Sequence, residues 1–170
     1  MQKISGLIIA ALFGSIIFVT KVFFTSPIDK LMIAVQAVLL CLSALFVKKV
    51  GATYAGIIGG ALTALARPTL GPFTFLFAFL YGVLVDVFFF LFKVSPTAGL
   101  ISNKRIMSAM TFSTAIIGLL SYYVTAVAVN LVPIDPILAG VILFTGTASG
   151  AAAGFAAAYL WNKHLKGIPF

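Results

Sequence analysis

Long apolar runs alternate with short polar or proline-containing stretches along the whole chain. Runs of about 20 apolar residues have the length that a helix needs to cross a bilayer, so the pattern predicts membrane-spanning helices. Six spans are predicted, at Ser5–Phe24, Leu31–Val47, Ala52–Ala66, Phe73–Phe92, Ile106–Leu131 and Ile137–Trp161. The expected fold class is therefore all-α: a polytopic membrane protein whose residues 1–170 form a single domain of six transmembrane helices.

The third span is unusually short and ends in the tight turn Arg67–Pro72. With about 15 residues at ~1.5 Å each, it covers roughly 23 Å, less than the ~30 Å of a hydrocarbon core. Non-helical backbone at that depth needs protein or water to satisfy its polar groups. We therefore expect the turn to lie in a water-filled cup, with a locally thinned bilayer as the alternative.

Composition agrees with a membrane protein, because 62% of the residues are hydrophobic and only 8% are charged. Soluble domains carry roughly 25% charged residues. In a soluble protein the net charge of +8 would suggest a nucleic-acid partner. Here the basic residues cluster at the ends of spans, where they set topology, so no nucleic-acid partner is expected. The lone Cys41 excludes a disulfide framework.

The distribution of basic residues predicts the orientation. With the N-terminus inside, eight of the eleven basic residues are cytoplasmic, and three, Lys21, Lys30 and Arg67, are on the outer side. The positive-inside rule then places both termini in the cytoplasm. We expect a multi-pass protein of the cell (plasma) membrane.

The chain lacks the parts of a catalytic site. One His, one Cys and three acidic residues on separate elements provide neither a metal site nor a nucleophile–base pair, so no enzyme activity, metal or cofactor is expected. No Walker-type glycine loop is present. Transport would therefore need an ion gradient or an ATPase partner. Asp86 is the one acid inside a span, and it either forms a substrate or proton site or pairs with Arg105, Lys48 or Lys93.

Polar side chains gather in the outer half of the predicted bundle, among apolar and aromatic residues. Such a cup suits a flat, uncharged or weakly charged small molecule. Arg67 has two interpretations: it binds a phosphate, carboxylate or ring acceptor of the substrate, or it reaches lipid headgroups. The candidate substrate-binding residues are Gln36, Thr63, Arg67, Thr74, Tyr81, Tyr122, Tyr123 and Asn130.

Small residues recur at four-residue spacing on three spans, which allows close approach of a second helix. In the sixth span the stripe is Gly146, Gly150, Gly154 and Ala158, and the third span carries a similar one. For these two spans we expect packing inside the bundle. The stripe Gly6, Ala10 and Gly14 of the first span either packs inside the bundle or docks a separate membrane subunit.

The stretch VKKVGATYAGIIGGALTALARPTLGPFTFLFAFLYGVLVDVFF resembles the central region of S components, the substrate-binding subunits of energy-coupling factor vitamin transporters. The likeness extends to chain length, six helices and the Gly-rich last span ending in AAYLWNKHLKG. The predicted span Phe73–Phe92, with LYGVLVDVFF, looks most like the thiamine or hydroxymethylpyrimidine branch. The resemblance implies an outward-facing site gated by Thr25–Lys30 and Arg67–Pro72, and docking through Gly6, Ala10 and Gly14.

The function expected from this resemblance is substrate binding for ATP-driven uptake of a vitamin or vitamin precursor. The implied partners are a coupling transmembrane subunit, two cytoplasmic ATPases, the lipid bilayer and a small vitamin-like substrate. The alternative is a non-transporting integral membrane scaffold subunit of a larger complex. Co-purification distinguishes the two, since bound substrate and ATPases support the first and unrelated membrane chains the second.

Overall fold

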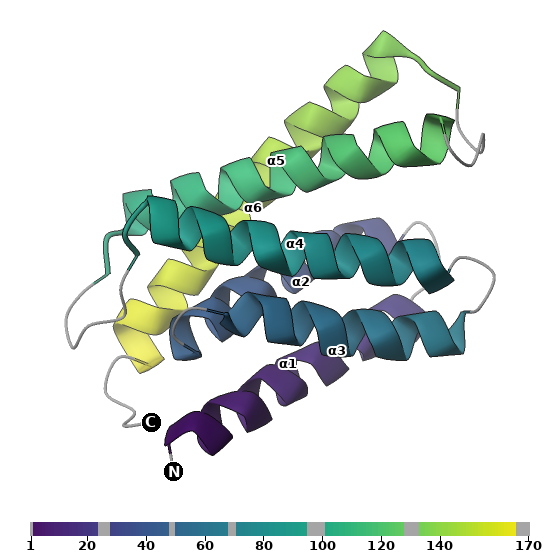
Figure 1. The fold of residues 1–170 in the computed structure, drawn as a ribbon. Coiled ribbons are helices and arrows are strands. Elements are labelled where there is room, and N and C mark those ends of the chain that lie inside the picture. The colour runs from purple at the N-terminus through teal and green to yellow at the C-terminus, as the bar shows by residue number, and fades with distance from the viewer. Residues whose placement is uncertain are drawn as a thin grey trace.

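The computed structural model of the chain describes residues 2–23, 28–47, 50–67, 71–94, 101–127 and 133–165, and these residues contain helices and no strands (Figure 1). The all-α fold class is confirmed. A π-helical turn, η1, extends the last helix. The elements are α1 (Gln2–Phe23), α2 (Ile28–Phe46), α3 (Gly51–Ala66), α4 (Gly71–Leu91), α5 (Asn103–Val127), α6 (Pro136–Leu160) and η1 (Trp161–Leu165).

The helices begin and end within a few residues of the predicted spans. Four helices, α1, α4, α5 and α6 with η1, are long and apolar enough to cross a membrane. The apolar part of α2, Met32–Phe46, and the whole of α3 are shorter. The short third helix is therefore confirmed, with 16 residues from Gly51 to Ala66.

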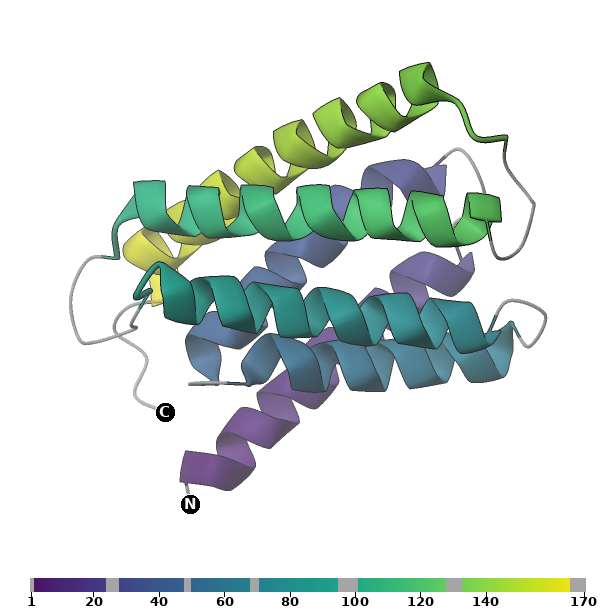
Figure 2. The same ribbon diagram turned by 45° about the horizontal axis from the view of Figure 1, so that its top comes forward.

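Consecutive helices run in opposite directions (Figures 1 and 2). We call the side of the bundle where α1 begins and α6 finishes the terminal end; it is at the left of Figure 1. The helices α1, α3 and α5 finish at the other side, which we call the opposite end. Helix α3 packs against α1 and α4, and α5 packs against α4 and α6. Helix α2 contacts all the other five α-helices, so it is the centre of the bundle.

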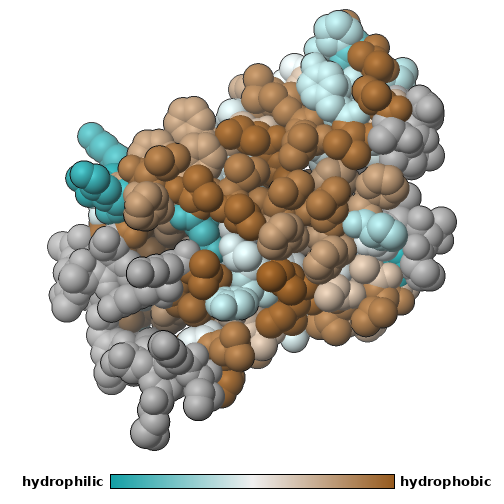
Figure 3. Space-filling model, viewed as in Figure 1, coloured by the Kyte–Doolittle hydropathy of each residue, from teal (hydrophilic) through white to brown (hydrophobic). Residues whose placement is uncertain are grey.

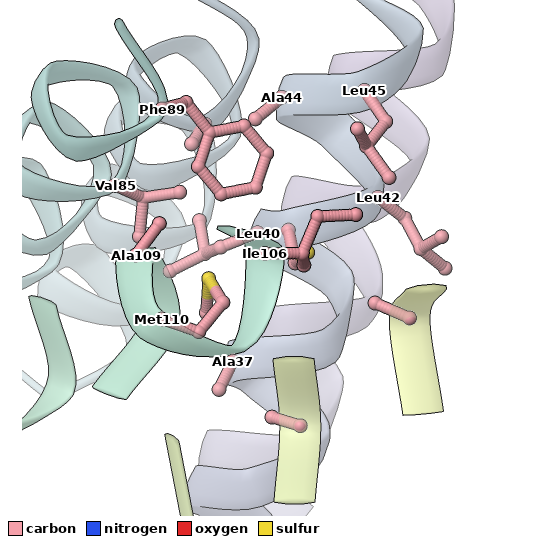
Figure 4. Close-up of a cluster of buried hydrophobic side chains, with 14 of the residues drawn as sticks. Ala37, Leu40, Leu42, Ala44, Leu45, Val85, Phe89, Ile106, Ala109 and Met110 are labelled. Carbon is pink, nitrogen blue, oxygen red and sulfur yellow. The ribbon is translucent and has the colours of Figure 1, made fainter. Parts of the chain in front are cut away.

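The central position of α2 follows from its side chains. Residues 40–45 are buried in succession, which requires neighbours on every side of the helix. Toward the opposite end this enclosure weakens, because Ile33 and Val35 are exposed. Figure 4 shows the apolar cluster that α2 forms with α4 and α5. Its labelled members are Ala37, Leu40, Leu42, Ala44, Leu45, Val85, Phe89, Ile106, Ala109 and Met110.

Large apolar side chains also cover the outside of the bundle. Leu65, Phe90 and Ile137 have exposed fractions of 81%, 82% and 77%. Hydrophobic surface extends over α4 and α5 in Figure 3. A soluble monomer rarely exposes contiguous apolar area on this scale, whereas lipid tails would cover it favourably. The surface therefore supports a membrane protein.

Glycines set the spacing of two helix pairs. A Cβ atom at Gly82 of α4 would lie 2.5 Å from the carbonyl oxygen of Ala52 in α3. A Cβ atom at Gly150 of α6 would lie 2.7 Å from the carbonyl oxygen of Met110 in α5. Only glycine permits backbones to approach this closely. The prediction that the small residues of the third and sixth spans pack inside the bundle is confirmed.

Candidate ligand-binding cavity

A cavity of about 330 Å³ lies between the middle of the bundle and its opposite end. Its position follows from its lining, which includes Lys21 near the end of α1 and Ile33 near the start of α2. The other walls come from α4, α5 and α6. Among the described residues, the lining consists of Lys21, Ile33, Ala34, Gln36, Phe77, Ala78, Tyr81, Thr114, Ile117, Gly118, Ser121, Thr145, Gly146 and Ser149.

The cavity exists because α5 and α6 separate toward the opposite end. A Cβ atom at Gly150 would lie 2.7 Å from its nearest neighbour in α5, whereas at Gly146 this distance is 3.3 Å. At Gly118 of α5 the nearest atom is the Cγ2 of Ile142, at 3.5 Å. The contact between the two helices therefore loosens from Gly150 toward Gly146 and Gly118, which both line the cavity. Figures 1 and 2 show α6 crossing the bundle obliquely, as this divergence requires.

Hydroxyl groups supply much of the polar lining. Thr114 donates to the Met110 carbonyl oxygen at 2.7 Å and lies 2.9 Å from the Tyr81 hydroxyl. Ser121, Thr145 and Ser149 each donate to a carbonyl oxygen of their own helix. Because their protons are used in this way, the oxygen lone pairs of these hydroxyls are left to accept hydrogen bonds. The lining thus favours a ligand with some donor groups on an otherwise apolar body.

Gln36 is a buried polar residue whose amide has no partner in the part of the chain that the structure describes. Its side chain has an exposed fraction of only 7% and lines the cavity. Among the described residues its amide has no hydrogen-bond partner. A buried polar group without a partner costs about 1–3 kcal/mol, and an amide offers two donors and an acceptor. A molecule in the cavity with a matching donor and acceptor would remove that cost.

Lys21 gives the cavity a positive charge. It belongs to the last turn of α1, is half-buried, and is the only charged residue among the described residues of the lining. The two aspartates with described side chains bond elsewhere: Asp86 to α3 and Asp135 to the start of α6. The side chain of Asp29 lies outside the described residues. Within the described part of the chain, no acid neutralises Lys21.

Two of the eight predicted substrate-binding residues, Gln36 and Tyr81, line this cavity. Thr63, Arg67, Thr74, Tyr122 and Tyr123 do not line it, and Asn130 lies outside the described residues. Thr63 is buried and donates to the carbonyl oxygen of Gly59, one turn earlier in α3. The structure therefore brings together only part of the predicted set.

Arg67 connects two helix ends. Its Nη2 donates to the carbonyl oxygen of Val22 at 3.1 Å, near the end of α1. A cation there is favourable because the last carbonyl groups of a helix carry partial negative charge. Its guanidinium contact is thus within the chain, and both interpretations drawn from the sequence stay predictions. The gates Thr25–Lys30 and Arg67–Pro72 fall partly outside the described residues, so gating stays a prediction.

Tyr122 holds the segment that precedes α6. Its hydroxyl oxygen accepts a hydrogen bond from the Asp135 amide at 2.7 Å and lies 3.1 Å from the Pro133 carbonyl oxygen. Asp135 in turn caps α6, with its carboxylate accepting from the Ile137 amide at 2.8 Å. The adjacent Tyr123 is exposed and contacts Tyr122 edge to face. Tyr122 therefore has a structural role at the α5–α6 connection.

Replacing Tyr122 by Phe should lower the free energy of unfolding by about 1–2 kcal/mol, because the change removes this hydroxyl and leaves its backbone partners unpaired. Chemical denaturation of the detergent-solubilised protein measures the effect. The matched control is Tyr123→Phe, which removes the hydroxyl of an exposed neighbour and should change stability little. Equal stability of the two variants would contradict the structural role.

The observed hydrogen bonds of Asp86 are to the start of α3, and not to the basic residues that the sequence suggested as partners. Its carboxylate accepts hydrogen bonds from the Ala52 amide at 3.2 Å, the Thr53 amide at 2.8 Å and the Thr53 hydroxyl at 2.6 Å. The expected partners Arg105 and Lys93 are not the groups that bond to it, and the side chain of Lys48 lies outside the described residues. Asp86 is also absent from the cavity lining. It caps the start of α3 from the neighbouring helix.

The stripe on α1 faces α3 and α2. A Cβ atom at Gly14 would lie 2.9 Å from both the Ala55 carbonyl oxygen and the Ile58 Cβ. Ala10 is fully buried, and the nearest atom to a Cβ at Gly6 is Val47 Cγ2 of the same chain, at 3.4 Å. The docking surface predicted at Gly6, Ala10 and Gly14 is therefore occupied within the protein. Large apolar residues, including Leu7, Ile8 and Leu12, form the exposed side of α1.

The residues that sequence reasoning missed are Lys21 and the small hydroxyl residues of the lining. Lys21 was interpreted only as a topology determinant. Thr114, Gly118 and Ser121 lie at spacings of four and three residues in α5, which places them on one helical face. Thr145 and Ser149 share a face of α6 in the same way. A search for faces that carry both glycine and hydroxyl residues would have found them.

Within the described ranges, no three His, Cys, Asp or Glu side chains come together as a metal site would require. No family model matches the sequence, and no curated protein or solved structure matches it either.

Proposed function

We propose that this protein is the substrate-binding membrane subunit of an ATP-driven transporter that takes up a vitamin or vitamin precursor. The supporting observation is the cavity of about 330 Å³, whose wall contains the buried amide of Gln36, a group with no hydrogen-bond partner among the described residues. Ligand pockets have volumes of roughly 300–1,000 Å³, with mostly apolar walls and a few placed polar groups. The cavity meets this description, with aromatic surface from Phe77 and Tyr81.

In this proposal the energy for transport comes from partner subunits, since the chain has no phosphate-binding glycine loop. The partners are a coupling transmembrane subunit and two cytoplasmic ATPases, and the complex lies in the cell membrane. The small-residue face of α1 is occupied by α3, so a partner that docks on α1 contacts the exposed side that includes Leu7, Ile8 and Leu12. The termini face the cytoplasm, as the basic residues predict.

Filling the cavity tests ligand binding. In Gly118→Leu, the first side-chain atom meets only Ile142 Cγ2, at an ordinary 3.5 Å, so the rest of the side chain enters the cavity. The matched control is Gly140→Leu on α6, a position outside the lining where an added Cβ atom would meet no neighbouring side chain or helix within 4 Å. Both variants should fold, because an added Cβ atom at either position meets no backbone of another helix within 4 Å.

Small molecules extracted from each purified protein are then quantified by mass spectrometry. We expect a molecule that the natural protein and Gly140→Leu retain and that Gly118→Leu loses at least about ten-fold, the effect of roughly 1.4 kcal/mol. Equal retention in all three proteins would contradict binding in the cavity. Co-purification with unrelated membrane chains, and without ATPases, would favour the scaffold alternative.

A further inference from the structure

We propose that the ligand of the cavity is an organic carboxylate: an apolar, flat-faced molecule whose carboxylate pairs with the Lys21 ammonium while the Gln36 amide bonds its other polar edge. This inference rests on the proposed function and specifies its substrate class. It differs from the expectation drawn from the sequence, which was an uncharged or weakly charged molecule. The two residues come from different helices, α1 and α2, so a ligand that bonds both would bridge them.

The charge of the lining favours an anion. Lys21 is the only charged residue that the described part of the chain contributes to it, and the other described lining residues are apolar side chains, glycines, hydroxyls and one amide. A half-buried ammonium in such surroundings loses part of its hydration, and an anionic ligand replaces what is lost. The described carboxylates cannot serve, because Asp86 bonds to Thr53 and Asp135 to Ile137.

The hydrogen-bonding groups of the lining also favour a carboxylate next to Lys21. Lys21 can only donate hydrogen bonds, and a carboxylate can only accept them. The hydroxyls of Ser121, Thr145 and Ser149 donate within their own helices, so they offer acceptors and would repel a carboxylate placed against them. The carboxylate is therefore expected at the Lys21 side of the cavity, with any donor groups of the ligand toward α5 and α6.

The unpaired amide fixes a second point of the ligand. Gln36 has an exposed fraction of 7% and no hydrogen-bond partner among the described residues, so a bound molecule that pairs with its amide gains a hydrogen bond there. The rings of Phe77 and Tyr81, from α4, form an apolar wall of the same cavity. Rings of this kind pack well against a flat, apolar body. A cavity of about 330 Å³ has room for one small molecule of this kind.

The test uses Lys21→Met, which keeps an unbranched apolar chain without the charge, and Lys21→Arg, which keeps the charge. The molecule retained by the natural protein is identified by accurate mass and by methyl-ester formation. We expect a carboxylic acid whose retention falls roughly ten- to hundred-fold in Lys21→Met, as for loss of a hydrogen bond to a charged group, and is largely kept in Lys21→Arg.

Defined probes provide a second measurement. 4-Phenylbutanoate and 4-phenylbutanamide have nearly the same shape and differ in charge, and each is titrated against the retained molecule in the purified protein. The acid should displace it at a lower concentration than the amide, and this preference should disappear in Lys21→Met. Inorganic phosphate at equal concentration reports whether any anion suffices, and it should displace the molecule poorly because it lacks an apolar body.

The outcomes separate this inference from the proposed function. A retained molecule that is neutral or cationic, or one that Lys21→Met retains normally, overturns the carboxylate inference and leaves a substrate-binding cavity in place. A phospholipid retained through Lys21 overturns it in favour of a lipid phosphate. If no molecule depends on the cavity, with Gly118→Leu matching the natural protein, both the inference and the proposed function are wrong.

Discussion

Replacing Gly14 by Leu is expected to separate α1 from α3 and to lower the free energy of unfolding by about 3 kcal/mol. The physical reason is the absence of space. A Cβ atom at this position would already lie 2.9 Å from the Ala55 carbonyl oxygen and 3.1 Å from the Gly59 amide nitrogen. Backbone atoms of a packed helix cannot move aside as the end of a flexible side chain can, so the helices themselves must part.

The neighbouring residue provides a matched control. Ser15 is exposed, about 100° around α1 from Gly14, and its hydroxyl bonds to the Ala11 carbonyl oxygen, so Ser15→Leu adds the same side chain where lipid would surround it. Thermal unfolding followed by size-exclusion chromatography in detergent should show a destabilised Gly14→Leu protein and a nearly unchanged Ser15→Leu protein. A stable Gly14→Leu variant that merely loses a partner subunit would restore the docking surface predicted from sequence.

The helices were predictable because a bilayer imposes a strong constraint on sequence. Apolar runs of sufficient length, interrupted by turn residues such as those between Ala66 and Gly71, define where spans begin and end. The central position of α2 was not predictable in this way. A helix with apolar residues on every side is expected both where lipid surrounds it and where other helices do, so hydropathy alone does not distinguish the two.

The candidate site was only partly predictable, because the sequence defines the depth of a residue in the bundle better than the direction of its side chain. Gln36 and Tyr81 were found because they are polar and lie toward the predicted outer half. Tyr122 and Arg67 meet the same criterion, yet they bond to the backbone at helix ends. Each residue turns the helix by about 100°, so a side chain at the right depth can face away from the cavity.

The role of Asp86 was also not predictable from the sequence. An acid inside a span is usually interpreted as functional. The N-cap residue of α3, Val50, makes no side-chain hydrogen bond to the helix. The first amide groups of a helix need acceptors and favour negative charge. Asp86 supplies both from α4, through its bonds to Ala52 and Thr53. Gly82 lies one turn before Asp86 and lets the two backbones come close enough for these bonds.

Removal of this carboxylate should therefore weaken the protein far from the cavity. For Asp86→Ala we expect the free energy of unfolding to fall by about 2–3 kcal/mol, since two backbone amides and a hydroxyl lose a charged acceptor. Asp86→Asn keeps one acceptor oxygen and should lose about half as much. Denaturant titration in detergent measures both effects.

Retention of the cavity ligand, measured at a temperature where both variants remain folded, separates the structural role from a functional one. A cap at the start of α3 predicts that folded Asp86→Asn protein binds the ligand almost as well as the natural protein, because Asp86 does not line the cavity. A substrate or proton site predicts the reverse: normal stability and lost binding.

Thr53→Val adds an independent check, since it removes one of the three hydrogen bonds to Asp86 and leaves the carboxylate in place. If Thr53→Val lowers stability and Asp86→Asn lowers it further, with binding kept in both, the carboxylate acts on α3 rather than on a substrate.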